Sequence, residues 1–321
     1  MPKRKSTRPP FQRAQRPAQL GILELERFSQ ETLTRWNALS EDLDELQAAL
    51  YFGILPEQRR LRESLLDAVR QSTPMTVPLS RWARIVTYQY STEPLSAAGS
   101  LHGWGGRFNA GPDLDQGTLD PWPALYIAED HETAFREKFQ MVAADKVDGL
   151  SARELALLHA VSHSTIFLDG TLRVVFDMTS ATSLNAVAKV LGRIKMPEDA
   201  RRLKKQLRIS HKALWMITTG QQLYQAVLEH NWRTLPVQFG LPAPGHTLGE
   251  LIRAAGFEGI LYRSTKGKAR CIAVFPDRLQ SGSSIELADA APSFVGHTRL
   301  DIETGDELSG WNSLPSPHSR R

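Results

Sequence analysis

The segment Leu125-Tyr126-Ile127-Ala128-Glu129-Asp130, with the residues that follow it to Glu137, decides how the centre of this chain folds. Its first four residues form a short apolar run, which is typical of a buried strand. Asp130 is a suitable N-cap, so a helix is expected from there to about Val142. Glu137 then lies two turns into that helix, on a face that also carries apolar residues. A carboxylate that points inward in such surroundings is either ion-paired or functional.

Outward from this segment, strands and helices alternate without a regular βαβ order. Period-two alternation predicts a strand that carries Arg84. Further strands are expected near 172–176, 260–262, 271–275 and 284–287. Helices are expected near 183–192, 197–207, 211–230 and 247–255. The glycines at 103–106 lack the G-x-G-x-x-G spacing of a dinucleotide-binding Rossmann turn. We therefore expect a mixed α+β domain from about 78 to 288.

The flanks of this domain have different compositions. Residues 1–20 hold six Lys or Arg residues and no acidic one, which predicts a disordered basic arm able to contact nucleic acid or anionic lipid by charge alone. Leucine spacing over 21–75 predicts a small helical region, in which Pro56 opens the second helix. Residues 289–321 are rich in Ser, Pro and Gly, so a loose tail is expected. The basic stretch 201–208 is expected to be a solvated helix face.

Composition also excludes several classes of protein. No apolar stretch approaches the roughly 20 residues of a membrane helix, and no apolar region follows the basic N-terminus as in a secretory signal. Cys271 is the single cysteine of the chain, so no disulfide can form within it. An intracellular, cytoplasmic protein is expected. His159 and His163 stand at helical metal-ligand spacing, but no third ligand completes a site, so no metal is expected.

Three polar positions carry chemistry that needs a partner. Arg84 lies among apolar neighbours, where an arginine requires a carboxylate or phosphate. The turn Gly105-Gly106-Arg107-Phe108-Asn109 lets backbone N–H groups approach a ligand, and its arginine offers a second anion contact. Ser264 follows the apolar run Gly259-Ile260-Leu261-Tyr262, close to two lysines. Each position also fits a structural role, as an ion pair or a turn residue.

Together, these strings resemble the RES family, which is named for an arginine, a glutamate and a serine. The match comprises Arg84, the Gly-Gly-Arg-aromatic-Asn motif with Phe108 in place of the usual tryptophan, and the eleven-residue interval from Tyr126 to Glu137. The resemblance implies a fold similar to the NAD-binding core of ADP-ribosylating toxins. It also implies that NAD is the substrate and that no other cofactor is needed.

The resemblance assigns roles residue by residue. Arg84 would hold the pyrophosphate or ribose of NAD, Tyr126 would stack on a base, and Glu137 would stabilise positive charge at the anomeric carbon. Further NAD contacts are implied for the turn, through its members Gly106, Arg107 and Asn109. Three residues are candidates for the family's serine role, and the choice between them is open. Ser264 is placed among the catalytic residues, and His246 and Thr247 are placed among the NAD-binding residues.

The implied activity is cleavage of the nicotinamide–ribose bond by hydrolysis or phosphorolysis, in a toxin that a cognate Xre-type antitoxin blocks. Transfer of ADP-ribose to a macromolecule, as a glycosyltransferase reaction, is the alternative. A catalytically inactive module that contacts nucleic acid is a further alternative. No membrane partner is expected.

Overall fold

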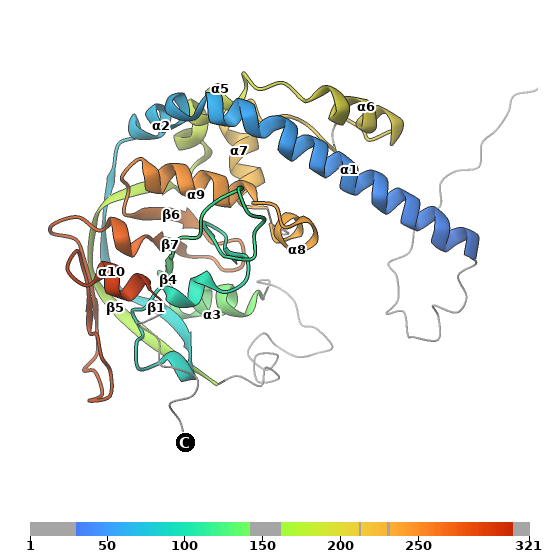
Figure 1. Ribbon diagram of the computed structural model, residues 1–321. Helices are drawn as coiled ribbons and strands as arrows, with labels where there is room; N and C mark the ends of the chain where they lie inside the picture. Colours follow the sequence, from blue (N-terminus) through green and yellow to red (C-terminus); the bar gives the residue numbers. More distant parts are fainter. Residues whose placement is uncertain (1–29, 142–161, 212, 230–231, 311–321) are drawn as a thin grey trace, which may run out of the picture.

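The computed structural model describes residues 30–141, 162–211, 213–229 and 232–310, and it shows a seven-stranded sheet with helices packed on it (Figure 1). The strand order is β1-β4-β7-β6-β5-β8-β9. The strands are β1 (Met75–Thr87), β4 (Leu125–Ala128), β5 (His163–Met178), β6 (Gly259–Arg263), β7 (Arg270–Val274), β8 (Ser284–Leu287) and β9 (Arg299–Leu300). Two short strands, β2 (Gly105–Gly106) and β3 (Asn109–Ala110), form a separate pair. The mixed helix and strand content predicted from the sequence is confirmed.

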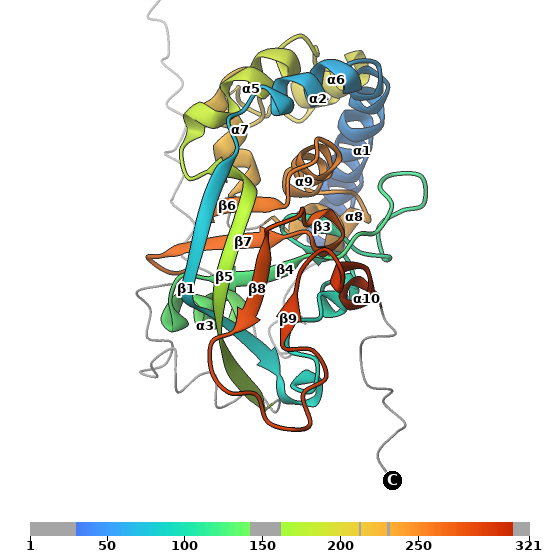
Figure 2. The same ribbon diagram turned by 90° about the vertical axis from the view of Figure 1, so that its left-hand side faces the viewer.

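The sheet curls back on itself. Strand β1 pairs antiparallel with both β4 and β5, so that β1, β4, β7, β6 and β5 close into a ring. The last residues of β5 run parallel to β6, while its middle pairs antiparallel with β8. Figure 2 shows β8 and β9 extending the sheet beyond this ring.

Side chains alternate between the two faces of the sheet and form two cores. In β6, Ile260 and Tyr262 pack into the core beneath the helices, while Leu261 faces the opposite core. In β4, Tyr126 and Ala128 face the helices, whereas Leu125 and Ile127 face away. The period of two in the sequence therefore decides that Tyr126 points to the helical side.

Helices cover that side of the sheet. They are α2 (Arg62–Arg70), α3 (His131–Phe139), α5 (Asn185–Leu191), α7 (Gly220–Val227), α8 (Thr234–Phe239) and α9 (Pro244–Ala254), with α6 (Glu198–Gln206) further out. Short 3₁₀ turns η2 (Tyr88–Tyr90), η3 (Ala98–Leu101), η4 (Ala181–Leu184) and η5 (Pro276–Arg278) lie between elements. The three helices expected between 183 and 230 are present but shorter, and α8 was not expected. None of the described helices is both long and apolar enough to cross a membrane.

The N-terminal helices attach to this body along one edge. Helix α1 (Gln30–Arg60) extends well past the rest of the molecule (Figure 1), and its Leu46 and Leu50 pack against α6. The prediction that Pro56 opens the second helix was wrong, because Pro56 lies inside α1 and α2 begins at Arg62. A proline removes one helical hydrogen bond, and burial of Leu50 before it and Leu61 after it offsets that loss.

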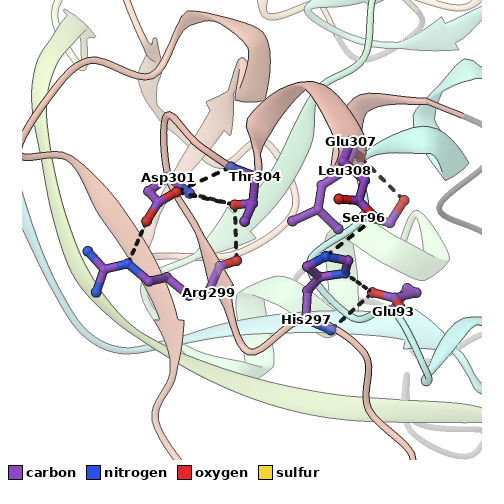
Figure 3. Close-up of polar contacts among 8 residues, drawn as sticks. All are labelled: Glu93, Ser96, His297, Arg299, Asp301, Thr304, Glu307 and Leu308. Carbon is purple, nitrogen blue, oxygen red and sulfur yellow. Dashed lines mark hydrogen bonds and ion pairs between the residues drawn. The ribbon is translucent and has the colours of Figure 1, made fainter.

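The segment after residue 288 differs from the expected loose tail over residues 289–310. It contains β9, which pairs with β8, and helix α10 (Gly305–Ser309). Leu300 and Leu308 are fully buried, which explains why a segment with few apolar residues still packs. Figure 3 shows how His297 reaches Glu93, with 3.0 Å between Nδ1 and Oε2. The basic arm at 1–20 lies outside the described residues.

Candidate active site

A cavity of about 410 Å³ opens between β1, β4, α3 and the loops that precede β2 and α8. Arg84, Tyr126 and Glu137 all line it, although they lie on three different elements. Gly106 and Arg107 contribute to the same wall. The structure thus brings together the three residues that the sequence reading placed at the centre of the chemistry.

Arg84 is a partly buried cation with one enclosed, unused donor. Its Nη2 donates to the carbonyl of Ser96 at 2.8 Å, but its Nε–H has no partner among the described residues. Burial lowers the pKa of Arg84 to about 10, so the guanidinium stays charged at neutral pH. Because a buried N–H without an acceptor is costly, this donor fits an anionic or carbonyl acceptor supplied by a ligand.

Segments distant in the sequence hold the loop that supplies this carbonyl. The hydroxyl of Ser96 donates to the carbonyl of Leu308, as Figure 3 shows, and the amide of Ala97 donates to the same carbonyl. His297 lies between Glu93 and Glu307, and the bond to Glu93 raises its pKa. The C-terminal segment therefore supports the acceptor of Arg84.

Tyr126 presents its ring to the cavity while its hydroxyl is held behind it. The hydroxyl accepts from the amide of Phe108 at 2.9 Å and donates to Oδ1 of Asn109 at 2.9 Å. Burial raises the pKa of Tyr126, so the phenol stays protonated. A Cβ at Gly106 would lie 2.5 Å from this hydroxyl, which explains the glycine. Tyr126 is therefore suited to stacking and not to proton transfer.

Asn109 is the centre of a polar network beneath the cavity. Its side chain is fully buried, and its Nδ2 donates to the carbonyls of Ser100 and Trp122 at 2.9 and 3.0 Å. Its Oδ1 accepts from the amide of Gly106 as well as from Tyr126. The side chain is used by these bonds, so Asn109 shapes the wall and does not itself line the cavity.

Glu137 enters the cavity from α3. The helix begins where Oδ1 of Asp130 accepts from the amide of Thr133 at 2.6 Å, the N-cap that the sequence predicts. The hydroxyl of Ser264, in the turn between β6 and β7, donates to Oε1 of Glu137 at 2.6 Å. That hydroxyl accepts in turn from the amide of Gly267 at 2.8 Å. Ser264 thus fixes the carboxylate from behind, and it does not line the cavity.

Arg107 is held firmly by the end of a helix. It is only 6% exposed, and its Nη1 donates to the carbonyls of Val227 and Glu229 at the C-terminal end of α7. Carbonyls at a helix C-terminus carry partial negative charge, so they suit a guanidinium. Burial lowers the pKa of Arg107. Nη1 of Arg107 is used by bonds that stabilise the fold, while the charged side chain still lines the cavity.

His246 and Thr247 lie elsewhere. His246 is fully buried, with its Nε2–H directed at the carbonyl of Gly106 (2.8 Å) and its Nδ1 accepting from the amide of Ala243 (3.3 Å). Burial lowers its pKa to about 4, so it is neutral. Neither residue lines the cavity with Arg84, and Thr247 instead lines a second, apolar cavity.

The sequence reading missed two cations and one indole at this site. Lys138, Trp232 and Arg233 line the cavity, and the Arg233 guanidinium lies 4.6 Å from the centroid of the Trp232 ring. Burial and the nearby Arg107 charge lower the pKa of Arg233. Lys138 is adjacent to Glu137 in the chain. No sequence motif identifies residues 232–233 as part of the site. They reach the cavity only because the helical segment that precedes them in the chain folds back toward it.

The remaining residues that the sequence singled out are two histidines and the single cysteine. Among residues 30–141, 162–211, 213–229 and 232–310, no group of three or more metal-binding side chains occurs. His163 lies in β5 against Phe135 and Phe139, and His159 is outside the described residues. Cys271 is free and buried, and burial raises its pKa well above the usual value.

Comparison with known proteins gives the family. The RES domain model matches residues 81–295, about two thirds of the chain. Among solved structures, the M. tuberculosis MbcT–MbcA toxin–antitoxin complex is similar, with 15% identity and a TM-score of 0.40 over 77% of this chain and 97% of that one. No curated protein matches. The matched range contains Arg84, Tyr126, Glu137 and Ser264, and the chain belongs to the RES domain family.

Proposed function

We propose that the chain cleaves the nicotinamide–ribose bond of NAD in the cavity lined by Arg84, Tyr126 and Glu137. The observation that carries this proposal is that a fixed carboxylate and a partly buried guanidinium with a donor that lacks a partner line one cavity. A volume of about 410 Å³ lies within the usual range of ligand sites, about 300–1,000 Å³.

Glu137 supplies the electrostatic part of the reaction. Breaking the bond between nicotinamide and ribose develops positive charge on the anomeric carbon, as in glycoside hydrolysis. A carboxylate whose position Ser264 already fixes stabilises this charge without reorganising. Nicotinamide leaves as a neutral base, so no strong general acid is required. This agrees with the protonated, fully hydrogen-bonded state of the Tyr126 hydroxyl.

The cationic side chains give the cavity its selectivity for an anionic substrate. Arg84, Lys138 and Arg233 line it together with the buried Arg107, against the two carboxylates Glu93 and Glu137. A pyrophosphate bound here would accept from the free Nε of Arg84, which makes a charge-assisted hydrogen bond. The rings of Tyr126 and Trp232 offer surfaces on which a base can stack.

We also propose that the chain acts as a toxin and that a separate Xre-type antitoxin covers the mouth of this cavity. Membership of the RES domain family supports this role. Water or phosphate is the proposed acceptor of the ADP-ribosyl group.

The test is the release of nicotinamide from NAD by purified protein. Glu137→Gln keeps an oxygen for Ser264 but removes the charge, so we expect activity to fall by about 10²–10³. Glu132→Gln is the matched control, because Glu132 is an exposed residue of the same helix outside the cavity. Product analysis with and without phosphate distinguishes hydrolysis, phosphorolysis and transfer to protein. No turnover by the wild type, with salt-sensitive binding of nucleic acid, would favour an inactive binding module.

A further inference from the structure

A second carboxylate, Glu93, lines the candidate active-site cavity from the loop between η2 and η3. Its side chain is 17% exposed, and the fold uses only one of its two oxygens for hydrogen bonds. Oε2 accepts from the ring Nδ1–H of His297 at 3.0 Å and from the backbone amide of the same residue at 3.3 Å (Figure 3). Oε1 accepts no hydrogen bond from the described residues and keeps accessible surface, so it can accept one from a ligand.

The C-terminal segment is shaped to hold this carboxylate. A Cβ at Gly296 would collide with Oε1 of Glu93, so a glycine is needed at this close approach. The amide of Gly296 donates to the carbonyl of Thr92 at 2.9 Å, which fixes the backbone beside Glu93. Behind the carboxylate, Nε2 of His297 lies 3.6 Å from Oε1 of Glu307. Neither Gly296, His297 nor Glu307 lines the cavity, so these residues hold Glu93 from outside it.

The two carboxylates of the cavity belong to different parts of its wall. Glu137 is held by Ser264, in the turn between β6 and β7. Burial lowers the pKa values of Arg107 and Arg233, and the charge of Glu137 is among those that oppose this lowering. Glu93 has no such effect on either arginine. Glu137 therefore lies at the end of the cavity near these arginines, and Glu93 lies away from that end.

The backbone ties Glu93 to Arg84 instead. The amide of Ser96 donates to the carbonyl of Glu93 at 3.1 Å, and the carbonyl of Ser96 accepts from Nη2 of Arg84 at 2.8 Å. One turn of backbone thus separates Glu93 from the guanidinium assigned to the pyrophosphate. A pyrophosphate joins the two riboses of NAD, and the ribose that carries nicotinamide is assigned to Glu137. The ribose that remains for the Arg84 end is that of adenosine.

A carboxylate in this place favours a hydroxyl group over a phosphate group. An ionised carboxylate only accepts hydrogen bonds, and a ribose 2′-hydroxyl can donate one. Acidic side chains are used in this way in other NAD-binding folds. In NADP the same hydroxyl carries a phosphate, which a carboxylate repels.

The cations of this part of the cavity would have the opposite preference. Arg84 and Lys138 both line it, and burial together with the charge of Arg84 lowers the pKa of Lys138, so the two cations lie close together. Two neighbouring cations attract a phosphate group. Glu93 is therefore the group that would decide against an additional phosphate here.

We propose that Glu93 accepts a hydrogen bond from the 2′-hydroxyl of the adenosine ribose and thereby selects NAD over NADP. This inference rests on the proposed function, because it takes the direction of bound NAD from Glu137 and Arg84. His297 is a positioning residue, which acts through Glu93 and does not touch the substrate. The support it gives lies beyond residue 295, where the match to the RES domain ends.

The test is calorimetric titration of the full chain with ADP-ribose and with 2′-phospho-ADP-ribose, which have no bond to nicotinamide. We expect the wild type to bind ADP-ribose about tenfold more tightly or better, because the phosphate meets a fixed carboxylate. Glu93→Gln keeps an acceptor and removes the charge, so this preference should disappear. Glu307→Gln is the matched control, because Glu307 contacts the same histidine from outside the cavity and its loss should leave the preference unchanged.

Gly296→Ala tests the position of the carboxylate separately from its charge. The added Cβ displaces Oε1 of Glu93, so binding of ADP-ribose should weaken. A preference that survives Glu93→Gln would overturn the proposal. Equal binding of the two ligands by the wild type would overturn it as well, as would the absence of saturable ADP-ribose binding.

Nicotinamide release distinguishes this result from the proposed function. A chain that shows the Glu93-dependent preference but releases no nicotinamide from NAD would contradict NAD cleavage and leave the ribose site standing. A chain that cleaves NAD and NADP equally well, before and after Glu93→Gln, would keep the proposed function and overturn the role of Glu93.

Discussion

Replacement of Tyr126 by phenylalanine separates the structural role of its hydroxyl from the chemistry of the cavity. The substitution keeps the ring and removes only the atom that accepts from Phe108 and donates to Asn109. The buried amide of Phe108 then loses its acceptor, while Oδ1 of Asn109 keeps the amide of Gly106. A buried donor without an acceptor costs about 1–3 kcal/mol, so we expect the free energy of unfolding to fall by about 2 kcal/mol.

Urea denaturation measures this change as a lower midpoint with an unchanged slope. Tyr88→Phe is the control, because Tyr88 is 53% exposed and its substitution should change the free energy of unfolding by less than about 0.5 kcal/mol. Nicotinamide release should survive Tyr126→Phe, since loss of a true acid–base group would cost about 10²–10⁴. Wild-type stability in this variant, or a loss of activity of that size, would refute the reasoning.

Three further predictions concern the surroundings of the cavity. Gly106→Ala should destabilise the protein and reduce nicotinamide release, because the added Cβ would lie 2.5 Å from the hydroxyl of Tyr126. Gly99→Ala is the control and should do neither, because Gly99 lines the same cavity but a Cβ there would meet no atom within 4 Å. Ser264→Ala should lower kcat about tenfold with little change in KM, because the carboxylate of Glu137 loses its 2.6 Å donor; an unchanged kcat would contradict the assigned role. The pKa of His297 is raised by its carboxylate partner, so its stabilising contribution is complete below the unfolded value of about 6.5 and is lost as pH rises through the higher folded value. Denaturation of His297→Gln across this range should show that this pH dependence has gone.

Local patterns in the sequence predict the core of the site well. Alternation along β4 places Tyr126 on the helical side, and the Asp130 N-cap sets the helix that carries Glu137 inward. Both features depend on neighbours within a few residues, so the sequence contains enough information to predict them.

Features that depend on long-range packing could not be predicted in this way. The segment 289–310 has a loop-like composition, yet burial of Leu300 and Leu308 folds it onto the sheet. Its effect on Arg84 passes through Ser96, more than two hundred residues away in the chain from Leu308. The order of residues also could not show that His246 is turned from the cavity, because a backbone carbonyl of Gly106 holds its ring.

Arg84, Tyr126 and Glu137 are proposed to surround one dinucleotide. A crystal structure of the Glu137→Gln variant with NAD tests it most directly, because the variant should bind the substrate but cleave it slowly. We expect the anomeric carbon of the nicotinamide ribose to lie beside position 137 and an NAD oxygen to accept from the guanidinium of Arg84. NAD bound outside this cavity, or inside it with no contact to Arg84, would show that these residues do not form the NAD site.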